Sequence, residues 1–328
     1  MLRKFISLLL ILIFSFSLLA DSKEDLKEVY NEINNFIKNN PDSPLLAEAY
    51  FNFAEVNELL HPVDYKKNAQ LYEKVISINS NFTDKDVVLY NIGFNLFQHR
   101  LDTRDEKRAE FRNRSSELQY PDSLRLSVSN LEKAINAFEE IRTNYKNSEY
   151  WNSAVLYLGR IYFNLGTDNP GKEEYFEKAI KYFGELANVK NIEDSNRGLF
   201  YRGWVYLMNG RYEESIDDFA KILENYDKYN LEERKLFLKE DSIDNIAFSI
   251  SEFDGIDYES KSEAAEKAEN IFLPVMDEDF GKKVIREIID LKHQYNAPMQ
   301  AVDFYNTYIS LYNESKEIPT IVDSIITI

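Results

Sequence analysis

Apolar residues recur every three or four positions along nearly the whole chain, and no stretch alternates convincingly between apolar and polar residues as a strand would. The first such stretch runs from Leu26 to Ile37 and ends at Asn39, Asn40 and Pro41. The 328 residues include only 10 Gly and 8 Pro, whereas strand-rich and dinucleotide-binding folds need more turn residues. The pattern therefore predicts an all-α fold of about 14 helices joined by short loops.

A motif of small and aromatic residues repeats within these predicted helices. In the clearest copy, Gly203 lies three residues before Tyr206 in one helix. After a turn at Gly210, Ser215 lies four residues before Phe219 in the next helix. Two helices packed about 8–10 Å apart leave no room for a large side chain where their axes come closest, so a small residue is expected there and a ring beside it. Other copies have their small first-helix residue at Ala54, Gly93, Gly159 and Ala247, and the last of these is followed by Ala268, Phe272 and Val275.

This order of residues resembles the tetratricopeptide repeat (TPR), in which a small and an aromatic residue recur in both helices of a hairpin. The resemblance covers roughly residues 44–313 and is clearest over residues 150–227. It implies a right-handed solenoid of antiparallel helix hairpins, whose long surface suits binding. No Ser- or Gly-rich linker interrupts residues 21–328, so we expect them to form one TPR-like helical repeat domain.

Residues 1–20 have the layout of a secretory signal peptide. Two basic residues, Arg3 and Lys4, precede an apolar run that ends at the small residue Ala20, before a polar stretch. The run is shorter than the roughly 20 residues of a spanning helix, and a single membrane anchor is the alternative interpretation. Asp21 stands where a lipoprotein signal needs its lipidated Cys, so no acyl anchor is expected.

The composition points to a bacterial periplasmic protein. The chain has no Cys, whereas eukaryotic secreted domains usually carry disulfides. We expect no integral membrane span in the mature chain. The 57 acidic and 39 basic residues give a net charge of −18 at pH 7, which disfavours nucleic acids and anionic membrane surfaces as partners.

The sequence favours binding over catalysis. Without Cys and with three separated His residues, it offers no thiol nucleophile, and we expect no metal or other cofactor. Acidic residues pair at helical spacing, as in Glu213/Asp217 and Asp241/Asp244, but these pairs are typical of solvated helix faces. The alternative is a glycan-active helical enzyme that uses an Asp/Glu pair.

Residues on the first helix of each hairpin that face away from the second helix should line the concave face of the stack. Several of them are aromatic, with Arg interspersed, and such groups carry most of the affinity in peptide and helix recognition. The alternative is that the same rings form the core between repeats. The candidate partner-binding residues are Tyr90, Phe94, Phe97, Arg160, Phe163, Arg197, Phe200 and Trp204.

Two segments depart from the repeat pattern. The insertion at residues 99–125 holds seven basic and six acidic residues in an otherwise acidic chain. It is interpreted as an extended helix with ion pairs along its surface, or as a docking element. Residues 318–328 are apolar and lack a polar capping face. Either a helix covers them, or the natural protein continues beyond Ile328, or they mediate self-association.

Together these observations predict a non-catalytic scaffold or adaptor of the bacterial cell envelope. It would bind a peptide or helix of an envelope protein on its concave face. Self-association through the C-terminal tail gives a structural envelope protein as a further alternative. The sequence does not name the partner or the envelope pathway.

Overall fold

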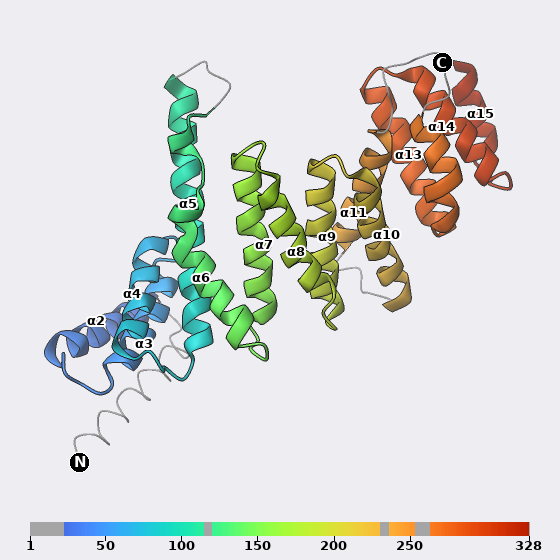
Figure 1. Cartoon of the computed structure of the whole chain (residues 1–328). Helices are drawn as coiled ribbons and strands as arrows, with labels where there is room; N and C mark the ends of the chain where they lie inside the picture. Colours follow the sequence, from blue (N-terminus) through green and yellow to red (C-terminus); the bar gives the residue numbers. More distant parts are fainter. Residues whose placement is uncertain (1–22, 115–119, 230–235, 253–262, 328) are drawn as a thin grey trace. The chain divides into compact units, whose positions relative to one another are not determined.

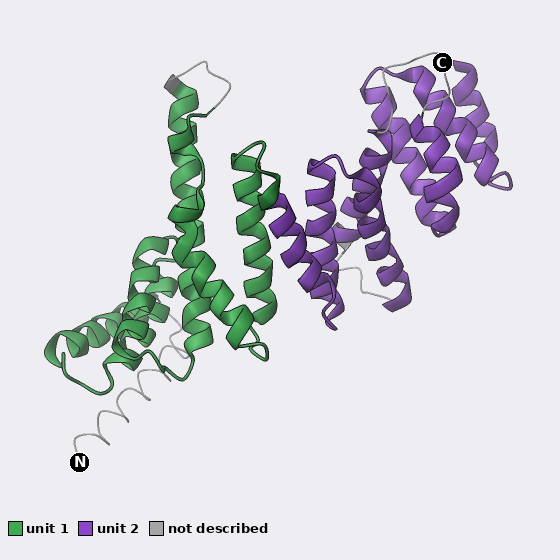
Figure 2. Ribbon diagram, in the orientation of Figure 1, with its two compact units in different colours: residues 1–175 green, residues 176–328 purple. Residues whose placement is uncertain are grey.

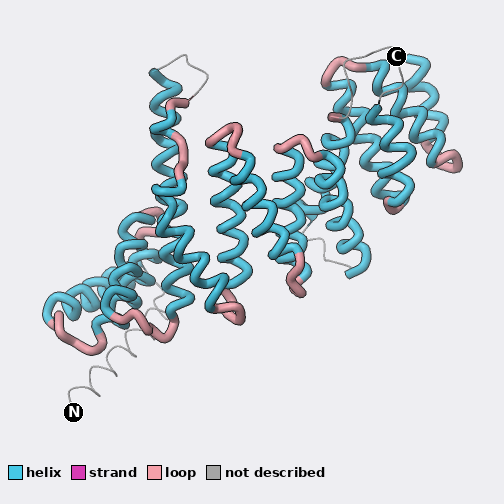
Figure 3. The backbone as a smooth tube through the Cα atoms, viewed as in Figure 1, coloured by secondary structure: helices cyan, strands magenta, loops and turns pink. Residues whose placement is uncertain are grey.

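The computed structural model describes residues 23–114, 120–229, 236–252 and 263–327. The predicted signal peptide, residues 1–20, lies outside them. Within these ranges the chain forms 14 α-helices, with short turns and loops and no strand (Figure 3). The predicted all-α fold and its number of helices are therefore confirmed.

The chain divides into two compact units, residues 1–175 and residues 176–328, which we call the N-terminal and C-terminal units (Figure 2). Helix α8 (Glu173–Ala187) begins in the last residues of the first unit and continues in the second. The predicted right-handed twist and single continuous domain concern how the units are arranged, and they stay predictions.

The N-terminal unit is a stack of helix hairpins (Figure 1). Each helix contacts the one that follows it, because its apolar stripe can be buried only against a neighbour. The helices are α2 (Lys23–Asn39), α3 (Leu46–Leu60), α4 (Tyr65–Ile78), α5 (Lys85–Arg114), α6 (Val128–Asn144) and α7 (Trp151–Asp168).

In the C-terminal unit most helices also pack on a sequence neighbour, and α13 (Glu278–Gln294) packs on α11 (Leu236–Ser251). A π-helical turn and a 3-10 turn follow α12 and complete the second arm of its hairpin. The helices are α9 (Ile192–Met208), α10 (Tyr212–Tyr229), α11 (Leu236–Ser251), α12 (Glu263–Lys267), α13 (Glu278–Gln294), α14 (Pro298–Leu311) and α15 (Ile318–Thr327).

Local sequence signals set several helix ends. The Asn191 side chain accepts from the backbone of residues 193 and 194 and so caps α9. Ser127 and Asn130 form a reciprocal capping box at the start of α6. Gly210, with a φ of 70°, makes the left-handed turn between α9 and α10 that residues with a Cβ rarely adopt.

The predicted pairing of a small residue with a ring is present in both units. A Cβ added to Gly93 would lie 2.7 Å from Cζ of Phe138, across the α5–α6 hairpin. At Gly203 the added Cβ would lie 3.0 Å from Cζ of Phe219, across the α9–α10 hairpin. Both rings are fully buried, so the close approach of the helices depends on glycine at these positions.

One predicted repeat position is wrong. Ala268 and Phe272 are buried as the motif requires, but Val275 is 79% exposed. Pro274 has no backbone N–H to continue the helix, and residues 273–275 form a 3-10 turn instead of a further turn of helix. The side chain of Val275 therefore leaves the apolar face.

The apolar C-terminal stretch forms α15, which packs on α14. Ile321 is buried, and Ile318 and Ile325 are partly buried against the core of the C-terminal unit. Val322 and Ile326 on the same helix are exposed. The predicted covering of this stretch by a helix surface is therefore partial.

Candidate functional site

Aromatic side chains from α5 and α6 converge on Tyr157 of α7 in the N-terminal unit. The ring centroid of Tyr157 lies 6.1 Å from that of Tyr90, 5.6 Å from that of Phe94 and 6.3 Å from that of Phe97. Tyr157 also stacks on Phe138 of α6, at 5.4 Å and an interplanar angle of 7°. The structure thus brings together three of the predicted partner-binding residues around Tyr157, which is not one of them.

Burial separates the core rings from those that a partner could reach. Phe97 and Phe138 are fully buried and belong to the core. Five other rings are half-buried and in contact with one another, because Tyr150 lies 4.8 Å from Tyr90, and Tyr65 of α4 lies 6.2 Å from Phe94. We call this set the ring cluster, and its members are Tyr65, Tyr90, Phe94, Tyr150 and Tyr157.

Arg160 adds a cation to the ring cluster. Its guanidinium lies over the ring of Tyr157, 5.2 Å from the centroid. Burial raises the pKa of the Tyr90 hydroxyl, while the nearby Arg160 opposes this change. Tyr90 therefore stays protonated and able to donate a hydrogen bond. Phe163, further along α7, is half-buried.

Two carboxyl groups of α3 lie near the ring cluster, since Glu58 bonds to α5 and the charge of Glu55 acts on Tyr150. Glu58 accepts hydrogen bonds from the Tyr72 hydroxyl at 3.0 Å and from Nδ2 of Asn95 at 2.6 Å, and so connects α3 with α4 and α5. Glu55, one turn earlier, is half-buried, and burial together with the charges of Glu58 and Asp84 raises its pKa to about 7. No hydrogen bond or ion pair reaches the Glu55 side chain in the described part of the chain.

The other three candidates, on α9, belong to the C-terminal unit. Arg197 is exposed, with Nη1 lying 3.5 Å from a carboxylate oxygen of Asp194 on the same helix. Phe200 packs edge to face on the buried Phe219, and Trp204 is half-buried against the core of this unit. For Phe200 and Trp204 the alternative interpretation, that they pack in the core, receives direct support.

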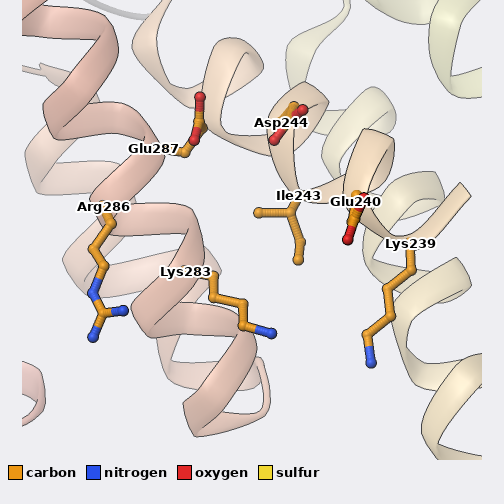
Figure 4. A pocket seen from close by; sticks show the side chains of 7 residues that line it. All are labelled: Lys239, Glu240, Ile243, Asp244, Lys283, Arg286 and Glu287. Atoms are coloured by element: carbon orange, nitrogen blue, oxygen red, sulfur yellow. The ribbon is translucent and has the colours of Figure 1, made fainter. Parts of the chain in front are cut away.

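A charged cleft of about 370 Å³ lies between α11 and α13 in the C-terminal unit. In Figure 4 the carboxylates lie toward one end of the cleft and the amino and guanidinium groups toward the other. Burial and neighbouring carboxylates raise the pKa of Asp244 and of Glu287. The lining residues are Lys239, Glu240, Ile243, Asp244, Lys283, Arg286 and Glu287.

Comparison with known proteins identifies the repeat. Residues 197–229, which contain most of α9 and all of α10, match the tetratricopeptide repeat family. The chain is a TPR-like protein. A TPR repeat-containing protein of Methanocaldococcus jannaschii is 27% identical over 175 residues, and the match covers 49% of this chain and 28% of that protein. The chain thus spans about a quarter of the length of that relative.

Solved structures also include a similar chain. A tetratricopeptide repeat protein from Parabacteroides merdae is 14% identical, with a TM-score of 0.49 and 98% of each chain covered. The family match itself covers the hairpin of Gly203 and Phe219, which the sequence analysis selected as the clearest repeat.

The insertion of this TPR-like protein is held in place by a buried carboxylate. Asp168, at the end of α7, lies 3.0 Å from Nη2 of Arg108 and 3.4 Å from Nη1 of Arg104, both on the long helix α5. It also accepts the backbone N–H of Leu126 at 2.9 Å. Figure 1 shows the last turns of α5 extending past α6. Residues 99–114 thus belong to the predicted extended helix, but Arg104 and Arg108 pair with Asp168 of α7 across the fold.

In residues 23–114, 120–229, 236–252 and 263–327, no group of three or more His, Asp or Glu side chains is placed to hold a metal ion. No helix in those ranges combines the length and apolar character needed to cross a bilayer.

Proposed function

We propose that this TPR-like protein is a non-catalytic protein-binding module that holds a peptide or helix of its partner against the ring cluster. Stacked helix hairpins of the TPR type generally mediate protein–protein interaction. The observation that carries the proposal is the ring cluster itself, in which five half-buried rings and Arg160 share one surface. Large rings and Arg supply most of the affinity in such interfaces, because they bury much apolar area at little conformational cost.

We further propose that the protein acts in the bacterial cell envelope as a scaffold or adaptor. The signal-peptide layout of residues 1–20 and the absence of Cys support this location. The partner would then be another envelope protein.

In-cell crosslinking followed by identification of the captured protein tests the proposal. Tyr65→Ala and Phe94→Ala remove exposed parts of the ring cluster, and we expect both to reduce capture strongly. Tyr295→Ala is the control, because Tyr295 is an exposed ring in the other unit. Undiminished capture by both ring-cluster variants, with circular dichroism showing that they are folded, would refute the proposed surface.

Self-association is a second candidate function, supported by the exposed apolar residues of α15. Ile326 is 76% exposed, and Val322 is also exposed. Light scattering on the chain with and without residues 318–328 tests it. An unchanged molar mass removes the candidate.

The glycan-active alternative would use carboxyl groups of the charged cleft, since those of Asp244 and Glu287 have raised pKa values. Incubation of the purified chain with peptidoglycan fragments tests it directly. Turnover that disappears in Asp244→Asn would contradict the non-catalytic proposal.

A further inference from the structure

We propose that Glu55 and Glu58, near the ring cluster, receive a basic side chain of the partner. The inference rests on the proposed function, and it specifies the chemistry of the bound segment. A Lys or Arg of the partner would lie with its apolar stem on the rings and its charged head at the Glu55 carboxylate.

The position of Glu55 follows from contacts between three helices. The two hydrogen bonds that Glu58 accepts, from Tyr72 of α4 and Asn95 of α5, fix the side of α3 that faces α5. Glu55 lies one turn earlier on the same side of α3. The charge of Glu55 acts on the hydroxyl of Tyr150, a member of the ring cluster, so this carboxylate lies near the cluster.

The charges that act on Glu55 are all acidic. They come from Glu58 on α3 and from Asp84 just before α5. Burial and the charges of Glu149, Asp86 and Glu55 raise the pKa of the Tyr150 hydroxyl, at the start of α7. These groups, together with the Tyr72 hydroxyl of α4, leave the negative charge of Glu55 uncompensated.

The cation closest in sequence to Asp84 is already paired. Nζ of Lys85 lies 2.7 Å from a carboxylate oxygen of Glu140 on α6. A half-buried carboxylate without a cationic partner is costly, and an incoming ammonium or guanidinium would remove this cost. A cation from the partner therefore gains more binding free energy at Glu55 than it would at a solvated carboxylate.

The neighbouring rings favour the same ligand class. Cations bind at the faces of aromatic rings, and the long stems of Lys and Arg pack on apolar surface while their heads reach polar groups. An acidic partner segment would instead meet the repulsion that already acts on Glu55. Charge complementarity thus selects a basic residue.

The inference predicts pH-dependent recognition. Glu55 is half ionised near pH 7, so its carboxylate attracts a cation more strongly as pH rises from 6 to 8. If only the ionised form binds the cation, affinity rises by up to about tenfold over this interval. Binding of the cation in turn lowers the pKa of Glu55.

NMR titration of the intact chain with short peptides tests the inference. The probes are acetyl-Leu-Arg-Leu-amide and the same peptide with norleucine in place of Arg. We expect the Arg peptide to shift ring-cluster resonances, to bind severalfold more tightly than the norleucine peptide, and to bind more tightly at pH 8 than at pH 6. Glu55→Gln should remove both differences. Glu28→Gln, an exposed carboxylate of α2, should leave them unchanged.

Equal binding of the two peptides, absence of any Arg-dependent shift, or an unaltered Arg preference in Glu55→Gln would overturn the inference. The proposed function has its own readout, namely capture of the partner in cells. Capture that depends on Phe94 but is indifferent to Glu55→Gln would leave the binding surface in place and reject the basic residue.

Discussion

Single atoms decide how closely the helices of a hairpin approach in this protein. The ring of Phe138 occupies the space where Gly93 has no side chain, and Phe219 does the same at Gly203. A Cβ added at either position would push the buried ring out of its place, and the surrounding core is too densely packed to accommodate that shift. Residue choice at these positions therefore controls the geometry of the whole hairpin.

The first prediction concerns Gly93. Gly93→Ala should destabilise the protein by about 1–3 kcal/mol, because overpacking against Phe138 exceeds the gain in helix propensity. Gly184→Ala on α8 is the matched control, since its added Cβ would lie 3.2 Å from Nη1 of Arg202 and would meet no ring. Urea unfolding measures both. A Gly93→Ala protein as stable as the control would contradict the packing account.

The second prediction concerns Glu55 and pH. Its folded-state pKa of about 7 lies above the ordinary value of 4.5, so the folded chain disfavours the ionised form. Stability from this group is complete below pH 4.5 and is lost as pH rises through 7. Glu55→Gln should therefore leave stability unchanged at pH 4 and raise it at pH 8 by about 1 kcal/mol, a figure reduced for solvent screening. Thermal unfolding at the two pH values measures this. Stabilisation of equal size at both pH values would show that the charge of Glu55 is not its cause.

At the scale of helices and loops, the long helix α5 depends on a contact far from it in sequence. Asp168 accepts from Arg104, Arg108 and the backbone of Leu126, and thus joins the insertion to the end of α7. The first part of the insertion, residues 99–114, is consequently held against the end of α7.

The third prediction tests this contact. Asp168→Ala should destabilise the fold by about 3 kcal/mol, because two arginines and one N–H lose a buried partner. Amide hydrogen exchange should accelerate in residues 99–114. Asp105→Asn is the control, because Asp105 is exposed and its pair with Arg104 contributes little. Unchanged exchange in Asp168→Ala would rule out this role of Asp168.

Helices could be predicted from the sequence more completely than contacts between them. The period of apolar residues and the small residues at Gly93, Gly159 and Gly203 suffice for the fold, because both signals are local. Asp168 was missed because its partner Arg104 lies 64 residues away and nothing near Asp168 in sequence marks it as buried. The exposure of Val275 was not predicted, because the repeat motif suggested that the helix continues, whereas Pro274 ends it.

The candidate surface could be predicted only in part, because the sequence shows spacing within one helix but not contacts between helices. Tyr90 and Phe94 were found because ring spacing on one helix is visible in the sequence. Tyr157 and Glu55 were not, since their importance comes from helices that meet only in the folded chain. Helical spacing also cannot separate a half-buried ring from a core ring, as Phe97 and Phe200 show.

At the scale of the whole molecule, the chain is acidic, and the surface that we propose for binding lies on the N-terminal unit. The net charge of −18 and the uncompensated Glu55 favour basic segments. The ring cluster supplies apolar area beside this charge. We therefore expect the acidic chain to attract basic partners in general and the ring cluster to bind one segment of them.

The fourth prediction, which tests this account most directly, is a site-specific photo-crosslinking measurement in cells. A photoreactive amino acid at position 94 should give one discrete adduct with a protein partner, whose crosslinked segment carries a Lys or Arg. The same amino acid at position 295 should give no such adduct. No adduct from position 94, or the same adduct from both positions, would contradict the account.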